Sequence, residues 1–337
     1  MKKLEITGKP KVLKELNMSL IKDVLSKKGH ATRVEIAEIT GISQPTVNQL
    51  IKGLLETETV INVGEANSTG GRRAEVYALN TKKSKLALIK IHDNYFETFV
   101  TDMELREEQH GKQKRNYKNS MHMQLEKLIQ KMITNEPCIQ AVSIGIPGAV
   151  LNDGTVFAIP SVPEWEYFPL SNWLEERVCI PVRVTNDINA SAIGYAGENP
   201  NVYNMIYLHT DGKGIGAGIC LNGKLYTGIG SFAGELGYMQ LGKQSVEELM
   251  HDGKTSLISI IAQITINLIC MFNPEKIIFS GHLNLDELII EVEEACEKVL
   301  PKTVIPKYEK VEAGAVYYYK GLGRIGLEAL NNDIRIL

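Results

Sequence analysis

From residue 85 onward the chain repeats one order of patterns twice: β-strands first, then alternating strands and helices. The first half has expected strands within 85–108, 141–150 and 182–187, and helices around 121–134 and up to Glu198. The second half has strands within 204–228 and 276–281 and a helix at 260–273. Alternation of this kind buries a sheet beneath helices. The doubled order therefore predicts a two-lobed α/β body with a cleft between the lobes.

The residues before this body have a helical pattern. Apolar residues form one stripe along 11–28, and Thr32 begins a second helix with Glu35 at the capping-box position. Gly41 ends that helix. Ser43 is expected to cap a third helix that runs to about Glu56, with a proline in its first turn. The order helix, tight turn, helix is typical of a DNA-binding helix-turn-helix.

In this motif small Ala37 lets the helices approach, whereas Val47 and Leu50 point into the core. Polar residues on the other side of the third helix are then free to contact base edges and phosphates. These candidate DNA-binding residues are Ser43, Gln44, Thr46, Asn48, Gln49 and Lys52. A small helical hairpin without DNA-binding function is the alternative.

Residues 59–80 read as strand, tip and strand, which is the wing of a winged helix. The tip contains Gly70 and Gly71, which permit a close backbone approach, and Arg72 and Arg73, which suit a narrow minor groove. A solvated hairpin with two surface charges is the alternative. Residues 1–80 carry 12 Lys/Arg and 9 Asp/Glu, a charge of +3, within a chain of net charge −3. The mildly basic front suits an anionic partner.

Composition indicates a globular cytoplasmic protein. The chain has 337 residues, of which 44% are hydrophobic and 23% charged. Its five cysteines form no CxxC motif, and the charged N-terminus has no secretory signal pattern. The longest apolar stretch, 257–272, is interrupted by polar residues and suits a core helix, so no membrane partner is expected.

Six motifs of the body resemble the ROK family (repressors, open reading frames and sugar kinases), which has an actin-like ATPase fold. In chain order they are GIPGAV (145–150), PEWEYFPL (163–170), VTNDINASAIGYAGE (184–198), TDGKGIGAGI (210–219), FAGELG (232–237) and IIFSG (277–281). Residues 1–80 resemble the N-terminal DNA-binding domain of the family's repressors. The resemblance implies a winged helix-turn-helix over 1–80 and ROK lobes over 81–200 and 201–320. It also implies a C-terminal helix within 321–337 that packs back on the first lobe.

One motif of the family's kinases is replaced. They open with Asp-x-Gly-Gly-Thr, whose glycines approach ATP phosphates and whose Asp helps to hold magnesium. The matching place here is Lys90-Ile91-His92-Asp93-Asn94. This replacement removes a metal-side carboxylate and adds side chains where phosphate would pass, so neither kinase activity nor ATP is expected. A misaligned, diverged loop is the alternative.

The family's zinc loop is also missing. Tyr238 stands where the family has a histidine, and no cysteine follows, so no zinc is expected. The remaining candidates for sugar binding are Gly148, Asn186, Asp187, Glu235 and Tyr238, with Trp165 able to border a ring. Alternatives are that Asp187 caps a helix, that Glu235 is a surface acid and that TDGKGIGAGI is a tight β-turn.

The leading hypothesis is a DNA-binding transcriptional regulator, most simply a repressor of carbohydrate-metabolism genes. Its body would sense a sugar or sugar-phosphate effector, and the family implies a homodimer or homotetramer on double-stranded operator DNA. The rival hypothesis is a sugar kinase with a DNA-binding head. A third is a DNA-binding regulator with no sugar effector.

Overall fold

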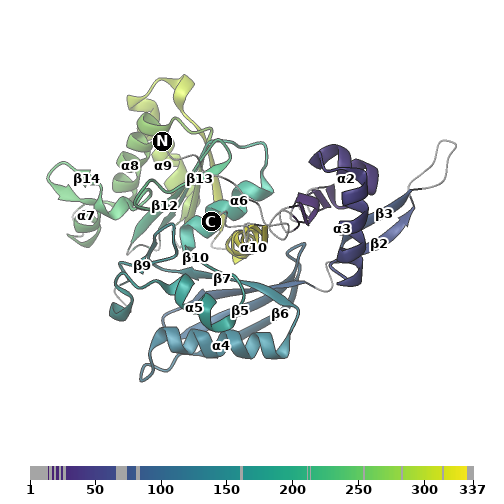
Figure 1. The fold of residues 1–337 in the computed structure, drawn as a ribbon. Coiled ribbons are helices and arrows are strands. Elements are labelled where there is room, and N and C mark those ends of the chain that lie inside the picture. Colours follow the sequence, from purple (N-terminus) through teal and green to yellow (C-terminus); the bar gives the residue numbers. More distant parts are fainter. Residues whose placement is uncertain are drawn as a thin grey trace, which may run out of the picture.

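The computed structural model describes residues 14, 17–18, 20–22, 24–25, 28–65, 74–80, 84–159, 162–210, 212, 214–252, 255–281, 284–312 and 315–331. A small N-terminal domain, here called the head, lies beside a larger two-lobed body (Figure 1). The head comprises strand β1 (Ala31–Thr32), helices α2 (Arg33–Thr40) and α3 (Gln44–Glu56), and strands β2 (Val60–Glu65) and β3 (Glu75–Leu79). Its sheet has the order β1-β3-β2.

Local hydrogen bonds explain where α2 begins. The backbone N–H of Thr32 donates to Glu35 at 2.8 Å, and the backbone N–H of Glu35 donates to the Thr32 hydroxyl at 3.3 Å. The predicted capping box is thus confirmed, and it satisfies two backbone donors that a helix start leaves unpaired. Gly41 ends α2 in the left-handed conformation, with φ 70°, as a tight turn requires.

The core of the head is built on one side of α3. Val47, Leu50, Ile51 and Leu54 are buried there, together with Tyr77 from β3 and other apolar residues. The inward positions predicted for Val47 and Leu50 are confirmed. The antiparallel pairing of β2 with β3 also confirms the two strands of the wing, whereas its tip lies outside the described residues.

The first lobe is built on a five-stranded sheet of order β10-β7-β4-β5-β6. Its strands are β4 (Lys85–Ile91), β5 (Tyr95–Asp102), β6 (Glu107–Lys114), β7 (Ile139–Ile146) and β10 (Val182–Asn186). Strand β7 lies parallel to both β4 and β10, whereas β4, β5 and β6 form an antiparallel meander. Helices α4 (Met121–Asn135) and α5 (Leu170–Val178) cover one face. Short elements between β7 and α5 are β8 (Ala149–Val150), β9 (Val156–Phe157) and η1 (Pro163–Trp165).

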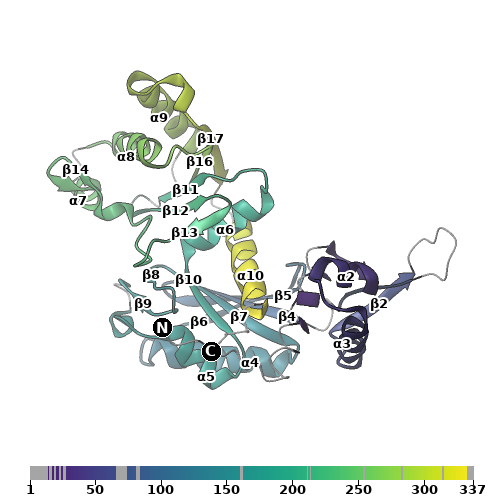
Figure 2. The same ribbon diagram turned by 45° about the horizontal axis from the view of Figure 1, so that its top comes forward.

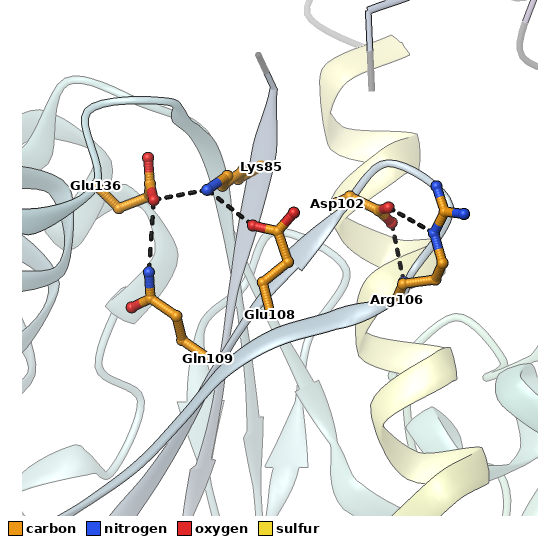
Figure 3. A network of polar contacts seen from close by, with 6 residues as sticks. All are labelled: Lys85, Asp102, Arg106, Glu108, Gln109 and Glu136. Atoms are coloured by element: carbon orange, nitrogen blue, oxygen red, sulfur yellow. Dashed lines mark hydrogen bonds and ion pairs between the residues drawn. The ribbon is translucent and has the colours of Figure 1, made fainter. Parts of the chain in front are cut away.

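Strand β6 was not predicted as a strand, because its residues EEQHGKQK contain no apolar alternation. Backbone pairing with β5 forms this strand, and ionic contacts fasten its start (Figure 3). The Lys85 ammonium lies 2.7 Å from Glu108 of β6 and 2.6 Å from Glu136 at the end of α4. Hydrogen bonds to both carboxylates raise the pKa of Lys85. At the turn between β5 and β6, Asp102 accepts hydrogen bonds from the backbone and side chain of Arg106.

The second lobe has a sheet of order β13-β12-β11-β16-β17. Its strands are β11 (Met205–Thr210), β12 (Ile215–Leu221), β13 (Lys224–Tyr226), β16 (Lys276–Gly281) and β17 (Lys307–Glu312). Helices α8 (Leu257–Phe272) and α9 (Leu285–Val299) cover one face of this sheet. The smaller elements are η2 (Leu236–Tyr238), β14 (Gln240–Leu241), β15 (Gln244–Ser245), α7 (Val246–Asp252) and η3 (Lys302–Val304).

Two helices, α6 (Asp187–Glu198) and α10 (Ala315–Asn331), lie between the two sheets (Figure 2). Tyr318 and Leu322 of α10 pack on Leu86 and Leu88 of the first lobe. Tyr195 and other α6 residues pack on the second lobe. Helix α10 thus begins six residues before the expected 321, and residues 332–337 lie outside the described part. None of the helices in the described part of the chain is long and apolar enough to span a membrane.

A carboxylate on β5 links this helix layer to the first sheet. Glu97 accepts a hydrogen bond from the Tyr319 hydroxyl at 2.8 Å, and the rings of His92 and His110 place a nitrogen 3.0 and 2.9 Å from it. Burial alone would raise the pKa of Glu97, but these hydrogen bonds outweigh burial and lower it to about 2. The folded state therefore favours the ionised form of this carboxyl.

We expect Glu97→Gln to flatten the acid limb of the stability curve. Because the folded pKa lies below the unfolded value, the stabilisation is present above pH 4.5 and is lost as pH falls toward 2. It amounts to at most about 3 kcal/mol. Urea unfolding between pH 3 and 7 measures this contribution to the free energy of unfolding, and Glu107→Gln, which changes an exposed carboxyl, is the control. An acid limb identical in wild type and Glu97→Gln would contradict the assignment.

Candidate functional site

The outer side of α3 is the first candidate site. Gln44, Asn48, Gln49 and Lys52 are exposed on it, opposite the buried residues of the same helix. Side chains three and four residues apart share one side of a helix. The structure therefore brings these four predicted DNA-binding residues together on one polar surface.

Two of the other predicted residues contact each other. Ser43 is the N-cap residue of α3, but its side chain makes no capping hydrogen bond. Its hydroxyl lies 2.8 Å from that of half-buried Thr46. The predicted N-cap position of Ser43 is confirmed, but its hydroxyl is paired with that of Thr46 and makes no capping bond to the backbone. Arg72 and Arg73 lie outside the described residues.

The second candidate site lies where β10 ends and α6 begins. The Asn186 side-chain oxygen accepts hydrogen bonds from the backbone N–H groups of Ile188 and Asn189, and its amide donates to the Gly148 carbonyl at 3.0 Å. Asn186 is thus the N-cap, and Asp187 is the first helical residue. Asp187 is therefore not the N-cap residue, as the alternative had it, although its Oδ1 also accepts a hydrogen bond from the Ile188 N–H at 2.9 Å.

Asp187 of α6 and Glu235 of the second lobe form what we call the acid pair. The loop before Glu235 is anchored on β12, since the Ala217 N–H donates to the Gly234 carbonyl at 2.8 Å. Burial, and then the nearby Asp187 carboxylate, raise the pKa of Glu235. The chain neighbours of the two acids meet on β12, where a Cβ added to Gly216 would lie 2.6 Å from the Ile188 side chain and 3.7 Å from the Gly234 carbonyl oxygen. Both acids are half-buried acceptors with the chemistry to bind hydroxyl groups.

The aromatic candidates lie in different surroundings. Tyr238 is exposed and its ring lies 5.1 Å from that of Phe232. Trp165 is only 1% exposed and belongs to the core of the first lobe with α4 and α5. The expectation that Trp165 could border a sugar ring is therefore wrong, because apolar packing encloses this side chain.

The turn after β4, at His92–Tyr95, is held closed by hydrogen bonds and ring stacking. The His92 N–H donates to the Tyr95 carbonyl at 2.9 Å, and the two rings stack at 4.2 Å. Arg115 donates to the His92 carbonyl, and the Tyr117 hydroxyl donates to the Asp93 carbonyl. Two carbonyls of this turn, those of His92 and Asp93, are thus occupied by side-chain donors.

The Gly-rich stretch at 210–219 joins antiparallel strands β11 and β12. The Thr210 hydroxyl donates to the Gly214 carbonyl at 2.8 Å and accepts from the Gly212 N–H at 3.2 Å. These bonds join the end of β11 to the residue before β12. Asp211 and Lys213 lie outside the described residues.

Two further features between the lobes were not singled out from the sequence. Asn152 of the first lobe accepts hydrogen bonds from the hydroxyls of Ser231 (3.2 Å) and Thr227 (3.5 Å) of the second. Tyr318 of α10 is 4% exposed, and its hydroxyl is without a hydrogen-bond partner among the described residues. The run of three tyrosines at 317–319 is the sequence feature from which Tyr318 could have been singled out.

No group of three or more His, Cys, Asp or Glu suited to a metal occurs in the described ranges.

Comparison with known proteins gives two family matches along the chain. Residues 89–256 match the ROK family, and residues 23–60 match a winged helix-turn-helix DNA-binding family. The chain is 27% identical over 237 residues to the xylose repressor of Bacillus subtilis (68% of this chain, 61% of that protein). It is 26% identical over 264 residues to the N-acetylglucosamine repressor of Escherichia coli O157:H7 (76% and 64%). The chain thus matches less than two thirds of the length of these two relatives.

A solved structure described as a ROK family transcriptional regulator, homolog of the E. coli MLC protein, has the same fold. Its TM-score is 0.75 at 17% sequence identity, and the match covers 96% of this chain and 99% of the other. This likeness extends over both head and body. It confirms the predicted combination of a winged helix-turn-helix with a two-lobed actin-like body.

Proposed function

The chain belongs to the ROK family and carries an N-terminal winged helix-turn-helix, and from this premise we propose that it is a transcriptional repressor of carbohydrate-metabolism genes. The head binds operator DNA, and the body senses a sugar or sugar derivative in the cytoplasm. The polar outer side of α3 carries this proposal, because Gln44, Asn48 and Gln49 are exposed there without packing on the body. Such side chains read base edges in the major groove.

The names of the two relatives support the proposal. One is called a xylose repressor and the other an N-acetylglucosamine repressor. A homodimer of this chain would place two copies of α3 about 34 Å apart, or at a multiple of this distance, on a palindromic site. A homotetramer would carry two such pairs of α3 helices.

The acid pair is the proposed sugar-binding element. Asp187 directly follows β10 of the first lobe, whereas Glu235 belongs to the second lobe. A ligand that bonds to both therefore favours the closed arrangement of the lobes. The ligand can change the free energy of DNA binding by at most the difference between its own binding free energies for the open and the closed arrangement of the lobes. Asp187 then acts as an acceptor for a sugar hydroxyl.

We further propose that the body transfers no phosphoryl group and needs neither ATP nor zinc. The closed turn at His92–Tyr95 supports this, because phosphoryl transfer depends on backbone donors and a metal that hold the phosphates in line. The acid pair is the feature that would suit the rival function, a sugar kinase. Sugar-dependent ATP hydrolysis that is abolished by Asp187→Asn would establish the kinase.

The experiment that tests the repressor proposal starts from random DNA. We expect repeated selection on the full chain to enrich a palindromic sequence, and a cognate sugar to weaken its binding. Asp187→Ala should bind the same DNA with unchanged affinity but respond at least tenfold less to the sugar. Failure to enrich any sequence would exclude the DNA-binding role. DNA binding that no sugar alters would leave a regulator without a sugar effector.

A further inference from the structure

A long groove lies between α8 and α9 on the outer side of the second lobe. Both views place these two helices away from the head (Figure 1 and Figure 2). The groove has a volume of about 710 Å³, and its α9 wall extends from Asn284 to Lys298. At the rise of an α-helix this wall is roughly 20 Å long. A groove of this length can receive about four turns of another helix.

The two walls of the groove differ in chemistry. Helix α8 contains no Asp, Glu, Lys or Arg, and it contributes Ile258 and Ala262 to the groove. Helix α9 carries six acidic residues and one lysine, which is a charge of −5. Three of its acids, Glu287, Glu291 and Glu294, line the groove. Because they recur every three or four residues, they form one stripe along it.

The charge of this stripe is only partly balanced within the chain. Glu294 lies 3.8 Å from Lys298, and Glu287 accepts a hydrogen bond from the Asn284 amide at 3.1 Å. Glu291 lies between them on an exposed part of the helix. Among the residues that the structure describes, no cation forms an ion pair with Glu291. The stripe therefore has acceptors available for cations from outside the chain.

Apolar side chains lie beside this stripe. Ile290 lines the groove and is 58% exposed, although it is a large aliphatic residue. Ile258 and Ala295 line the groove as well and are only half-buried. An apolar lining with a charged rim is the pattern of a surface that another protein covers.

The charge of α9 determines which class of partner fits. A symmetric contact between two copies of this chain through the groove would place α9 against α9, and two helices of charge −5 repel each other. DNA and anionic membranes are repelled for the same reason. A helix with one apolar side and flanking Lys or Arg is attracted instead. Its apolar side covers Ile290, and its cations pair with Glu287 and Glu291.

We propose that the groove between α8 and α9 is the docking site of a basic amphipathic helix from another protein. The inference is independent of the proposed sugar sensing, because neither residue of the acid pair lines the groove. Since the groove lies away from the head, the chain can hold this partner and operator DNA at the same time (Figure 2).

Two matched peptides test the proposal on the full chain. The probe is an amidated peptide of about 16 residues with leucines on one side of the helix and lysines on the flanks. The control has the same composition in scrambled order, so its charge is equal but no apolar side forms. We expect calorimetry to give a Kd of about 1–100 μM for the probe, weaker as salt rises, and at least tenfold weaker binding for the control. Equal affinity of the two peptides, or no binding of the probe up to about 1 mM, would overturn the proposal.

Charge reversal on α9 locates the contact. Glu291→Lys changes an exposed acid that lines the groove, whereas Glu293→Lys makes the same change at an exposed position on another side of the helix. We expect Glu291→Lys to weaken probe binding at least tenfold and Glu293→Lys to change it by less than about threefold. An equal loss in both variants would overturn the proposal, because it would reflect only the overall charge of α9.

Sedimentation of the same two variants tests the occupant. We expect both to keep the oligomeric state of the wild type. A change of that state in Glu291→Lys alone would overturn the proposal, because it would assign the groove to a second copy of this chain.

Discussion

Replacing Gly321 with alanine should lower the melting temperature of the body, although alanine is the better helix former. Gly321 of α10 lies against the backbone of α6: a Cβ added to it would lie 1.8 Å from the Ala190 carbonyl oxygen and 3.1 Å from the Gly194 nitrogen. Gly194 faces α10 in the same way, with its added Cβ 1.8 Å from the Tyr317 carbonyl oxygen. The two helices thus touch backbone to backbone, and no side chain there can move aside.

Two opposing contributions decide whether Gly321→Ala stabilises or destabilises the body. Glycine to alanine in a helix gains about 1 kcal/mol of helix propensity. Overpacking typically costs about 1–3 kcal/mol and exceeds this where backbone must shift. We expect a net loss of about 2 kcal/mol, which lowers the melting temperature of a body of this size by about 4–8 °C. The two tryptophans of the chain, Trp165 and Trp173, both lie in the first lobe, so their fluorescence follows the body.

A second glycine gives a control with the opposite sign. Gly53 lies within α3, and a Cβ added there meets no atom within 4 Å. Gly53→Ala should therefore stabilise the head by up to about 1 kcal/mol, since only helix propensity changes. Far-UV circular dichroism follows that transition. If Gly321→Ala stabilised the body as Gly53→Ala stabilises the head, the backbone contact of α6 with α10 would be disproved.

This contact also bears on function. Helix α6 begins at Asp187, and α10 carries Tyr318, which packs on Gly145 of β7, and Tyr319, which donates to Glu97 of β5. Because the two helices touch along their backbones, any displacement of α6 would move α10 with it. Closely packed elements shift between discrete arrangements and do not deform gradually. The helix pair is thus the natural connection between the acid pair and the first sheet.

Local signals in the sequence predicted the local structure well. The Thr32–Glu35 capping box, the turn at Gly41 and the buried Val47 and Leu50 all follow from interactions within a few residues. The strands of the body were predicted where apolar residues form continuous runs. Strand β6 was missed because its pattern is polar throughout, whereas its formation depends on backbone pairing with β5.

The candidate site was less predictable because its contacts join distant parts of the chain. The adjacent Asn186 and Asp187 are both suitable helix caps, and only the backbone geometry assigns the cap to Asn186. Trp165 lies within the motif PEWEYFPL, and nothing local indicates that α4 and α5 enclose it. Tyr318 is more than a hundred residues from Lys90 and Asp187, so no spacing rule connects them.

Replacing Gln44 and Asn48 together with alanine should abolish selective DNA binding while leaving the fold intact. Both side chains are exposed on α3, one helical turn apart, and neither belongs to the core that Val47, Leu50 and Leu54 form on the opposite side. Amide side chains pair with adenine through two hydrogen bonds, and each such pair discriminates against a wrong base by about 1–3 kcal/mol. The double variant should therefore lose about 2–6 kcal/mol of specific binding.

Lys52→Ala supplies the contrast that identifies how each residue contributes. Its exposed ammonium, one turn further along α3, is suited to a phosphate. Its loss should weaken binding to every sequence alike and reduce the salt dependence of the binding constant by about one unit of slope. Fluorescence anisotropy on the selected palindrome and on scrambled DNA, at several salt concentrations, separates the two effects. If the double variant still preferred the palindrome, α3 would not be the element that reads the sequence, and the wing would become the candidate.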